Sequence, residues 1–213
     1  MLRIHLAGTT AAALIASALA AVPAQAQQPA PPPFATTKVT DNVYIFRYGG
    51  HQSMFIVTPA GVIATDPISE RRPAKPYIDA IQAVTKAPIK YVIYSHHHYD
   101  HIAGGKPFKA LGATFVAHEN VKKRLAPLGD PDTVLPDHTV SNAGDVVSLG
   151  ETRVELTYVG RNHSDSSLVM RLPKEKIIFA VDFLPIAKFP ALAMIDAYPL
   201  EWEDSIKKVL AMD

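Results

Sequence analysis

The chain has 213 residues, a length that suits one substantial domain better than two ordinary ones. Hydrophobic residues make up 48% of it and charged residues 19%, so a buried core is expected and disorder throughout the chain is not. The formal net charge is +1 and the basic residues form no long run, which argues against a nucleic-acid-binding surface. Cysteine is absent, which excludes disulfides and metal sites built on thiolates.

The first residues have the composition of an export signal. Arg3 precedes an Ala/Leu-rich run that extends to about residue 22, and Ala24 and Ala26 place small residues where a signal peptidase reads the chain. Residues 1–26 are therefore predicted to be a secretory signal peptide, and the mature protein is expected in the periplasm or outside the cell. An uncleaved membrane anchor is the competing interpretation, although the run is short and Ala-rich for a membrane span. No membrane association is expected after cleavage.

The rest of the chain is predicted to be a short tether, 27–38, and one domain, 39–213. The tether contains the Pro-rich stretch QQPAPPPFAT, which is typical of extended chain. In the domain, alternating or continuous apolar segments predict strands at 43–48, 53–58, 61–65, 89–94, 114–117, 146–149, 153–159, 168–172 and 176–181. Apolar residues at helical spacing predict helices at 73–85, 106–111, 119–125 and 200–212. The Pro-, Asp- and Gly-rich segment 126–145 is predicted to be a loop with one short strand. Because strands and helices mix along the whole domain, an α/β protein whose sheets are covered by helices is expected.

A dense group of metal-binding side chains follows the predicted strand 89–94. The sequence there is SHHHYDH, from Ser95 to His101. Alternate side chains of extended backbone share a side, so His96 and His98 should point the same way. Asp100 and His101 come where the chain turns and can face the same cavity. Two imidazoles for one ion, and a carboxylate with an imidazole for another, suit Zn²⁺.

The pattern H-x-H-x-D-H after a strand resembles that of the metallo-β-lactamase superfamily, and the resemblance extends from about Val43 to the end of the chain. The run GVIATD at 61–66 looks like the family's strand that ends in an aspartate, and HIAGG at 101–105 looks like its helix start. The resemblance implies an αββα four-layer sandwich. Family members usually carry one more histidine for the second metal, on a strand after the last helix predicted here. The last strands and helix are therefore expected to be missing, and the domain to be incomplete at its C-terminus.

The resemblance also implies roles for residues outside this motif. His163 lies just beyond the predicted strand 153–159 and resembles the third ligand to the first ion. Asp182 follows the predicted strand 176–181 and resembles the aspartate that bridges both ions. Asp66 is expected to orient the ligand loop rather than to bind metal. His51, in the run GGHQS, lies on a predicted hairpin that could overhang the site, and a contact with the substrate is hypothesised for it.

The three other histidines near predicted elements are assigned no role. They fit exposed or strand-end positions, which is the usual environment of an isolated histidine. They are His97, His118 and His138.

Together these features predict an exported zinc-dependent hydrolase that attacks a small-molecule substrate with a metal-bound hydroxide. The expected ligands are His96, His98 and His163 for the first ion and Asp100, His101 and Asp182 for the second, whose site is expected to lack the family's further histidine. Asp100 is also the predicted catalytic residue, because it would orient the nucleophile. No G-x-S-x-G motif supplies a side-chain nucleophile.

The substrate stays open at the level of sequence. A β-lactam hydrolase and a thioesterase are the specific alternatives, and the absence of cysteine excludes the β-lactamase subclasses with a thiolate ligand. A non-catalytic metal-binding accessory protein is the alternative from another class. A di-iron redox site fits less well, because such sites on this fold usually carry a glutamate where His98 stands. The sequence predicts no oligomeric state.

Overall fold

The computed structural model describes residues 33–68, 74–186 and 196–212. The predicted signal peptide and the first residues of the predicted tether lie outside the described residues. Within the described part of the chain, no helix has the length and apolar character needed to cross a membrane.

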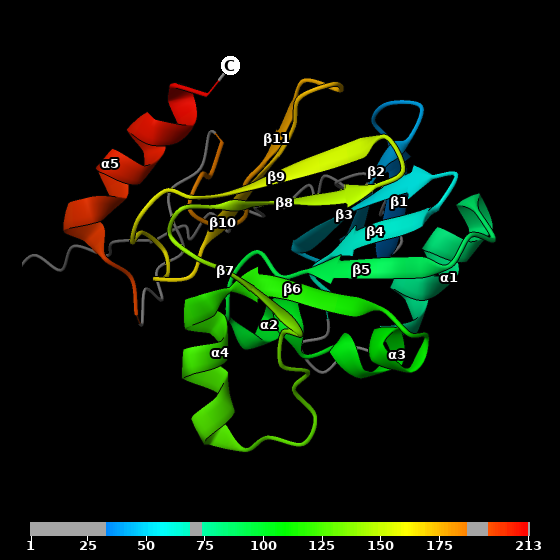
Figure 1. The fold of residues 1–213 in the computed structure, drawn as a ribbon, viewed down its shortest axis with the longest axis horizontal. Helices are drawn as coiled ribbons and strands as arrows, with labels where there is room; N and C mark the ends of the chain where they lie inside the picture. The colour runs from blue at the N-terminus through cyan, green and yellow to red at the C-terminus, as the bar shows by residue number, and fades with distance from the viewer. Residues whose placement is uncertain (1–32, 69–73, 187–195, 213) are drawn as a thin grey trace, which may run out of the picture. The chain divides into compact units, whose positions relative to one another are not determined.

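Two sheets form the centre of the fold (Figure 1). The first sheet has seven strands in the order β1-β2-β3-β4-β5-β6-β7. Its strands are β1 Phe34–Lys38, β2 Val43–Tyr48, β3 His51–Thr58, β4 Gly61–Thr65, β5 Ile89–Ile93, β6 Thr114–His118 and β7 His138–Val140. The pairs from β1 to β4 are antiparallel and those from β4 to β7 are parallel. The second sheet is antiparallel, in the order β11-β10-β9-β8. Its strands are β8 Asp145–Leu149, β9 Thr152–Tyr158, β10 Leu168–Leu172 and β11 Ile177–Phe179.

Helices cover the sheets. They are α1 Lys75–Val84, α2 Tyr99–Ile102, α3 Gly105–Ala110, α4 Glu119–Leu125 and α5 Pro199–Leu210, with a 3₁₀ turn η1 at Ala126–Leu128. The helix α1 forms where predicted, because its apolar residues Tyr77, Ile78 and Ile81 recur at helical spacing and are buried on one face. The first four helices follow strands of the first sheet in the chain, and α5 follows the second sheet.

Strand β4 shows how the layers are built. Every one of its side chains is buried, as expected for a strand covered on both faces. Val62 and Ala64 pack in a cluster with Tyr77 of α1 and other helix residues, whereas Ile63 between them packs in a second cluster with Val154 of the second sheet. The alternation of side chains thus places one core between helices and sheet and another between the two sheets.

A third core lies between the second sheet and α5. Trp202 and Val209 of this helix pack against Val169 of β10 and against Phe183. The indole N–H of Trp202 also donates a hydrogen bond to the carbonyl of Phe183 at 2.7 Å. Three cores separate four layers, helix, sheet, sheet and helix, so the four-layer α/β fold predicted from the sequence is confirmed.

The tether prediction is wrong for its last five residues, which form strand β1. This strand pairs with β2 along its whole length, from Phe34 opposite Tyr48 to Lys38 opposite Tyr44. All its side chains are exposed, so its sequence shows no alternation of apolar and polar residues. The free edge of β2 supplies the backbone partners that create the strand.

Every predicted strand and helix in the domain coincides with an observed element, and two short elements were not predicted. These are α2, within the ligand motif, and η1. A helix of four residues, such as α2, is too short to show a periodic pattern. The loop predicted at 126–145 does contain one short strand, β7.

The core between the sheets can be tested with one pair of matched variants. Ile63→Ala removes a side chain with 0% exposure, whereas Ile186→Ala makes the same change at a side chain that is 83% exposed. We expect Ile63→Ala to lower the free energy of unfolding by about 2–5 kcal/mol, and Ile186→Ala to change it by less than about 0.5 kcal/mol. Urea unfolding measures both. Equal effects would contradict the assignment of Ile63 to a core.

Candidate metal centre

The side chains predicted as ligands come from the ends of several strands. Strand β5 leads into the segment with His96 and His98, and α2 carries Asp100 and His101. His163 lies in the loop between β9 and β10, and Asp182 lies a few residues after β11. In layered α/β folds such strand ends are where ligand sites gather.

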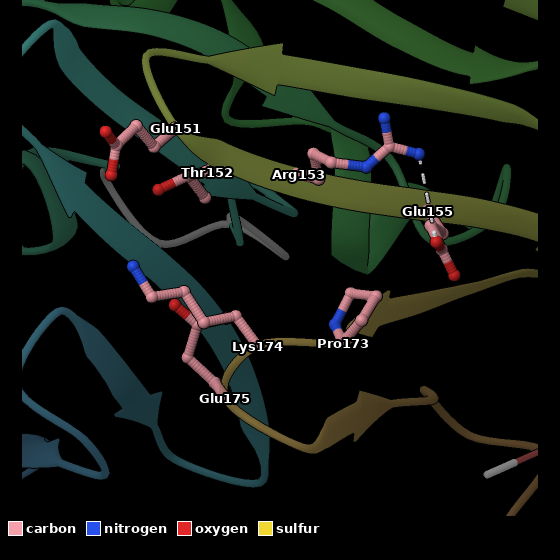
Figure 2. A pocket seen from close by; sticks show the side chains of 7 residues that line it. All are labelled: Glu151, Thr152, Arg153, Glu155, Pro173, Lys174 and Glu175. Carbon is pink, nitrogen blue, oxygen red and sulfur yellow. Dashed lines mark ion pairs between the residues drawn. The ribbon is translucent and has the colours of Figure 1, made fainter.

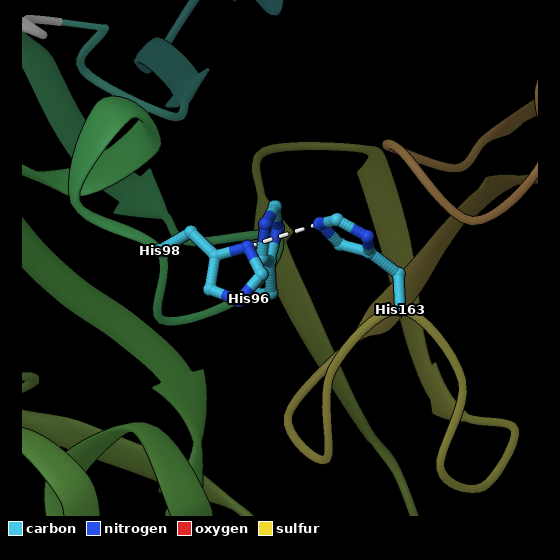
Figure 3. Close-up of side chains that lie close together, drawn as sticks. All are labelled: His96, His98 and His163. Atoms are coloured by element: carbon cyan, nitrogen blue, oxygen red, sulfur yellow. Dashed lines mark hydrogen bonds between the residues drawn. The ribbon is translucent and has the colours of Figure 1, made fainter. Parts of the chain in front are cut away.

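The first three histidines converge (Figure 3). His98 Nδ1 and His163 Nε2 are 2.9 Å apart. The ring of His96 lies 4.5 Å from that of His98 and 5.2 Å from that of His163, measured between centroids. One nitrogen from each of the three rings lies within 4.8 Å of the others, so the three could hold one ion.

Asp182 brings a carboxylate to the same place. Its Oδ2 atom is 2.9 Å from His101 Nε2, 3.6 Å from His163 Nε2 and 3.7 Å from His96 Nε2. One carboxylate oxygen thus lies near nitrogens of both predicted ion sites, which is the placement required of a bridging ligand.

A second group of possible ligands adjoins the first. Asp100 Oδ2 is 3.5 Å from His101 Nε2 and 2.8 Å from His51 Nε2. The ligand atoms of these three residues also lie within 4.8 Å of one another. His51, predicted only as a possible substrate contact, is therefore part of the cluster.

Buried nitrogens without a hydrogen bond show that the donor set suits a cation. Among the described residues these are Nε2 of His96 and both ring nitrogens of His101, and the two Nε2 atoms lie 3.7 and 2.9 Å from Asp182 Oδ2. Buried polar atoms are almost always hydrogen-bonded, so such atoms in a native structure call for an explanation. Imidazole nitrogens and carboxylate oxygens are the ligands that Zn²⁺ takes in the absence of thiolates, and a divalent ion would satisfy both Nε2 atoms.

Asp66, which was predicted to orient the ligand loop, contacts the backbone beside the ligand motif. It follows β4, and its Oδ1 atom accepts a hydrogen bond of 2.6 Å from the backbone N–H of Ser95, the residue before the ligand motif. Its other oxygen lies 3.4 Å from His101 Nδ1. Ser53 of β3 in turn donates a hydrogen bond to the Asp66 carbonyl at 2.5 Å. Asp66 thus ties the ligand segment to the two strands β3 and β4.

The backbone is strained at two of these aspartates. Asp66 has φ of 31° and Asp182 has φ of 64°, values in a region that residues other than glycine seldom adopt. Strained backbone of this kind is found most often at functional sites, where the surrounding structure holds it in place.

Asp196 is a further contact of the histidine cluster that was not predicted from the sequence. Its two carboxylate oxygens lie 2.8 Å from His98 Nε2 and 3.0 Å from His97 Nε2. His97 also contacts the hydroxyl of Ser166 through Nδ1 at 2.8 Å. An aspartate that holds a ligand histidine by its other nitrogen orients the ring toward the metal. No motif marks Asp196, because 98 residues separate it from His98.

The other two histidines occupy the positions predicted for them. His118 ends β6 and caps the helix α4 by accepting a hydrogen bond from the N–H of Asn120. His138 begins β7 and is exposed. His97 is different, because it is half-buried against Ser166 and Asp196 rather than exposed.

The histidines of the cluster differ in the direction of their pKa shifts. Burial, and then the neighbouring histidines, hold the pKa of His96 well below its ordinary value. Burial also lowers the pKa of His163, with His98 adding to the effect. Burial alone would lower the pKa of His101, but the carboxylates of Asp182 and Asp66 raise it to about 10 in the absence of an ion. Neutral imidazoles are the form that binds metal, so the low pKa of His96 and His163 favours binding at neutral pH.

A separate pocket lies at the other end of the second sheet (Figure 2). It is lined by Glu151 of the β8–β9 turn, by Arg153 of β9 and by Lys174 and Glu175 of the β10–β11 turn. His163 follows the opposite end of β9. Charges of both signs line this pocket, and among its lining residues Arg153 and Glu155 approach to 3.9 Å. It has none of the histidines of the candidate metal centre.

Comparison with known proteins agrees with this geometry. Residues 47–213 match the model of the metallo-beta-lactamase superfamily. Since that match covers most of the chain, the chain belongs to this superfamily, whose members are mostly metal-dependent hydrolases.

Two curated relatives illustrate the range of the family. The chain is 29% identical over 160 residues to the metallo-beta-lactamase type 2 of Bacillus cereus, an alignment that covers 72% of this chain and 59% of that protein. It is 24% identical over 184 residues to the 2,4-dinitroanisole O-demethylase subunit alpha of Nocardioides sp. (strain JS1661), covering 85% of this chain and 56% of that protein. The chain thus spans between a half and two thirds of the length of these relatives.

Solved structures support the fold. The metallo-beta-lactamase from Pontibacter korlensis superposes with a TM-score of 0.73 and 22% identity, over 83% of this chain and 84% of that one. The metallo-beta-lactamase IND-7 superposes with a TM-score of 0.72 and 21% identity, over 84% of each chain. At these identities the likeness concerns the fold.

His97 provides a test of the cluster that does not depend on activity. Burial, and then repulsion by His98, lower its pKa from 6.5 to about 4. Below pH 6.5 the unfolded chain therefore takes up a proton at this residue that the folded protein does not bind. The free energy of unfolding should fall as the pH drops from about 6.5 towards 4, with a contribution of about 1–2 kcal/mol from this residue at pH 5.

Urea unfolding of chelator-treated protein at pH 7 and pH 5 measures this contribution. In His97→Asn, which cannot titrate in this range, the loss between pH 7 and pH 5 should be smaller than in the parent by about 1–2 kcal/mol. Equal losses in the two proteins would contradict the burial of His97 as a neutral side chain.

Proposed function

We propose that this protein is a zinc-dependent hydrolase with two ion sites and a small-molecule substrate. One observation carries the proposal. The rings of His96, His98 and His163 converge, and Nε2 of His96 is buried among them without a hydrogen-bond partner in the described part of the chain. The contact between His98 and His163 leaves this nitrogen of His96 unpaired, whereas a divalent ion would satisfy all three rings.

The residues divide between two ions. His96, His98 and His163 would hold the first ion, and Asp100, His101 and Asp182 would be among the ligands of the second. The Oδ2 atom of Asp182 lies within 3.7 Å of nitrogens of both groups, so this carboxylate is proposed to bridge the two ions. Zinc bound here would lower the pKa of a water molecule toward neutrality and would polarise a carbonyl or an equivalent oxygen of the substrate.

Asp100 is proposed to orient the attacking water. Burial alone would raise its pKa, but the hydrogen bond with His51 and the charge of His101 lower it to about 2. The carboxylate is therefore ionised at neutral pH and can accept a hydrogen bond from a water beside it. Asp196 is proposed to keep the His98 ring in place through its 2.8 Å contact with Nε2.

β-Lactams are the leading candidate substrates. The supporting observation is that several similar proteins carry the name metallo-beta-lactamase. A thioester is the alternative implied by Asp182, which resembles the bridging aspartate of thioesterase-type members of the family. The relative named O-demethylase adds an aryl methyl ether as a third class. The predicted signal peptide supports a proposed location in the periplasm or outside the cell.

Activity should depend on zinc. Purified protein would be assayed on a panel of β-lactams, thioesters and an aryl methyl ether, first as isolated, then after treatment with a chelator, and again after zinc is restored. We expect turnover of at least one class, loss of turnover with the chelator and recovery with zinc, and about two zinc ions per chain by elemental analysis. Two bound ions without turnover of any substrate would favour the non-catalytic accessory protein.

The role of Asp100 predicts a large effect on rate. Asp100→Asn should lower kcat/KM at least about a hundredfold, because the neutral amide orients the water less well and weakens the second ion. Asp41→Asn is the matched control, because Asp41 lies in the exposed turn between β1 and β2 and pairs only with exposed Lys38. A loss for Asp100→Asn that is no larger than for Asp41→Asn would exclude the proposed role.

A further inference from the structure

His51 lies where a ligand of the second ion would lie. Its Nε2 atom is 2.8 Å from Asp100 Oδ2, and that oxygen is 3.5 Å from His101 Nε2. Zinc bonds of about 2.0–2.2 Å place neighbouring ligand atoms of a tetrahedral site roughly 3–3.5 Å apart. The distance between Asp100 and His101 lies at the upper end of this range, and the distance between His51 and Asp100 lies just below it. The rings of His51 and His101 meet edge to face at 5.4 Å between centroids.

The backbone holds His51 in this place. It is the first residue of β3, directly after the two-glycine turn that joins β2 to β3, and it pairs with Tyr48 across that turn. Gly49 in this turn has φ of 60°, which glycine adopts without strain, and its N–H donates to the carbonyl of Pro33 at 2.8 Å. The turn therefore fixes the register of β3 and the position of the ring.

The strands β3 and β4 also position His101. Ser53, two residues after His51 and on the same side of β3, donates a hydrogen bond to the Asp66 carbonyl. The carboxylate oxygen Oδ2 of Asp66 lies 3.4 Å from Nδ1 of His101. His51 and His101 are thus positioned by one connected set of strands, rather than by a separate loop.

Coordination number adds a third argument. A catalytic zinc site commonly has three protein ligands and keeps a further position for water or substrate. With His51, the second ion would have three ligands that it does not share with the first ion, namely two imidazoles and the carboxylate of Asp100. Asp182 Oδ2, which lies 2.9 Å from His101 Nε2, would be shared between the two ions. The second ion would then have as many ligands of its own as the first.

We propose that His51, on the hairpin between β2 and β3, is a protein ligand of the second metal ion. The inference rests on the proposed function, because it requires that ions bind at the centre. It replaces the hypothesis that His51 contacts the substrate. The alternative is that His51 only donates a hydrogen bond to Asp100. The variant His51→Gln distinguishes the ligand role from the hydrogen-bond role.

The test compares metal affinity in four proteins. The full chain and the variants His51→Gln, His51→Ala and His138→Gln are stripped with a chelator and titrated with Zn²⁺ against a chromophoric competitor, and with Co²⁺ by visible absorption. Glutamine can donate a hydrogen bond to Asp100 but lacks the basic ring nitrogen that binds zinc. His138→Gln is the matched control, because His138 is exposed and pairs with Asp145 away from the centre.

We expect the parent and His138→Gln to bind two ions with the same two affinities. His51→Gln and His51→Ala should bind the first ion as the parent does and the second at least about tenfold more weakly, with a changed cobalt spectrum for the second equivalent only. An unchanged first affinity also shows that the variants are folded.

The other outcomes separate the two proposals. If His51→Gln keeps both affinities, His51 acts through a hydrogen bond and the inference is wrong while the proposed function stands. If both affinities fall equally, the substitution disturbs the whole centre and the inference is again wrong. If the parent binds no ion at all, the proposed function fails and the inference fails with it.

Discussion

The whole centre depends on bringing imidazole nitrogens together in a place where water does not reach them. Among the described residues, Nε2 of His96 and both ring nitrogens of His101 make no hydrogen bond, and the two Nε2 atoms lie in the ligand cluster. Leaving a buried polar atom unpaired costs roughly 1–3 kcal/mol, so the arrangement persists only if the remainder of the fold is stable enough to hold it. The three cores supply that stability, and a cation that binds the two Nε2 atoms would remove their cost.

Asp66 is the residue through which the fold controls the centre. It stands at the end of β4, which is buried on both faces, and its carboxylate and carbonyl contact the backbone of Ser95 and the hydroxyl of Ser53. These bonds fix the ligand segment relative to β3 and β4 before any ion arrives. Because it is fully buried, Asp66 exerts this control without competing for the ion as an accessible ligand would.

The carboxylates around the imidazoles explain how so many histidines can share one site. Asp182 and Asp196 each contact at least two of the rings, and Asp100 contacts the rings of His51 and His101. Burial and mutual repulsion keep His96 and His163 neutral, while the neighbouring carboxylates stabilise positive charge on His101. The same carboxylates would favour a divalent cation, which would displace the proton on His101 when it binds this ring.

The sequence by itself determined the four-layer class of fold and nearly all of its strands and helices, and it predicted the segment 95–101 as a source of metal ligands. It could do so because apolar periodicity and a compact ligand motif are local properties of the chain. Strand β1 was missed because its own sequence has no strand pattern. It forms because it pairs with β2. The contacts of Asp196 with His98, and of His51 with Asp100, are 98 and 49 residues apart in sequence. Only the tertiary structure could decide these, because the distance between two side chains at the ends of different strands depends on how the sheets pack and not on the residues in between.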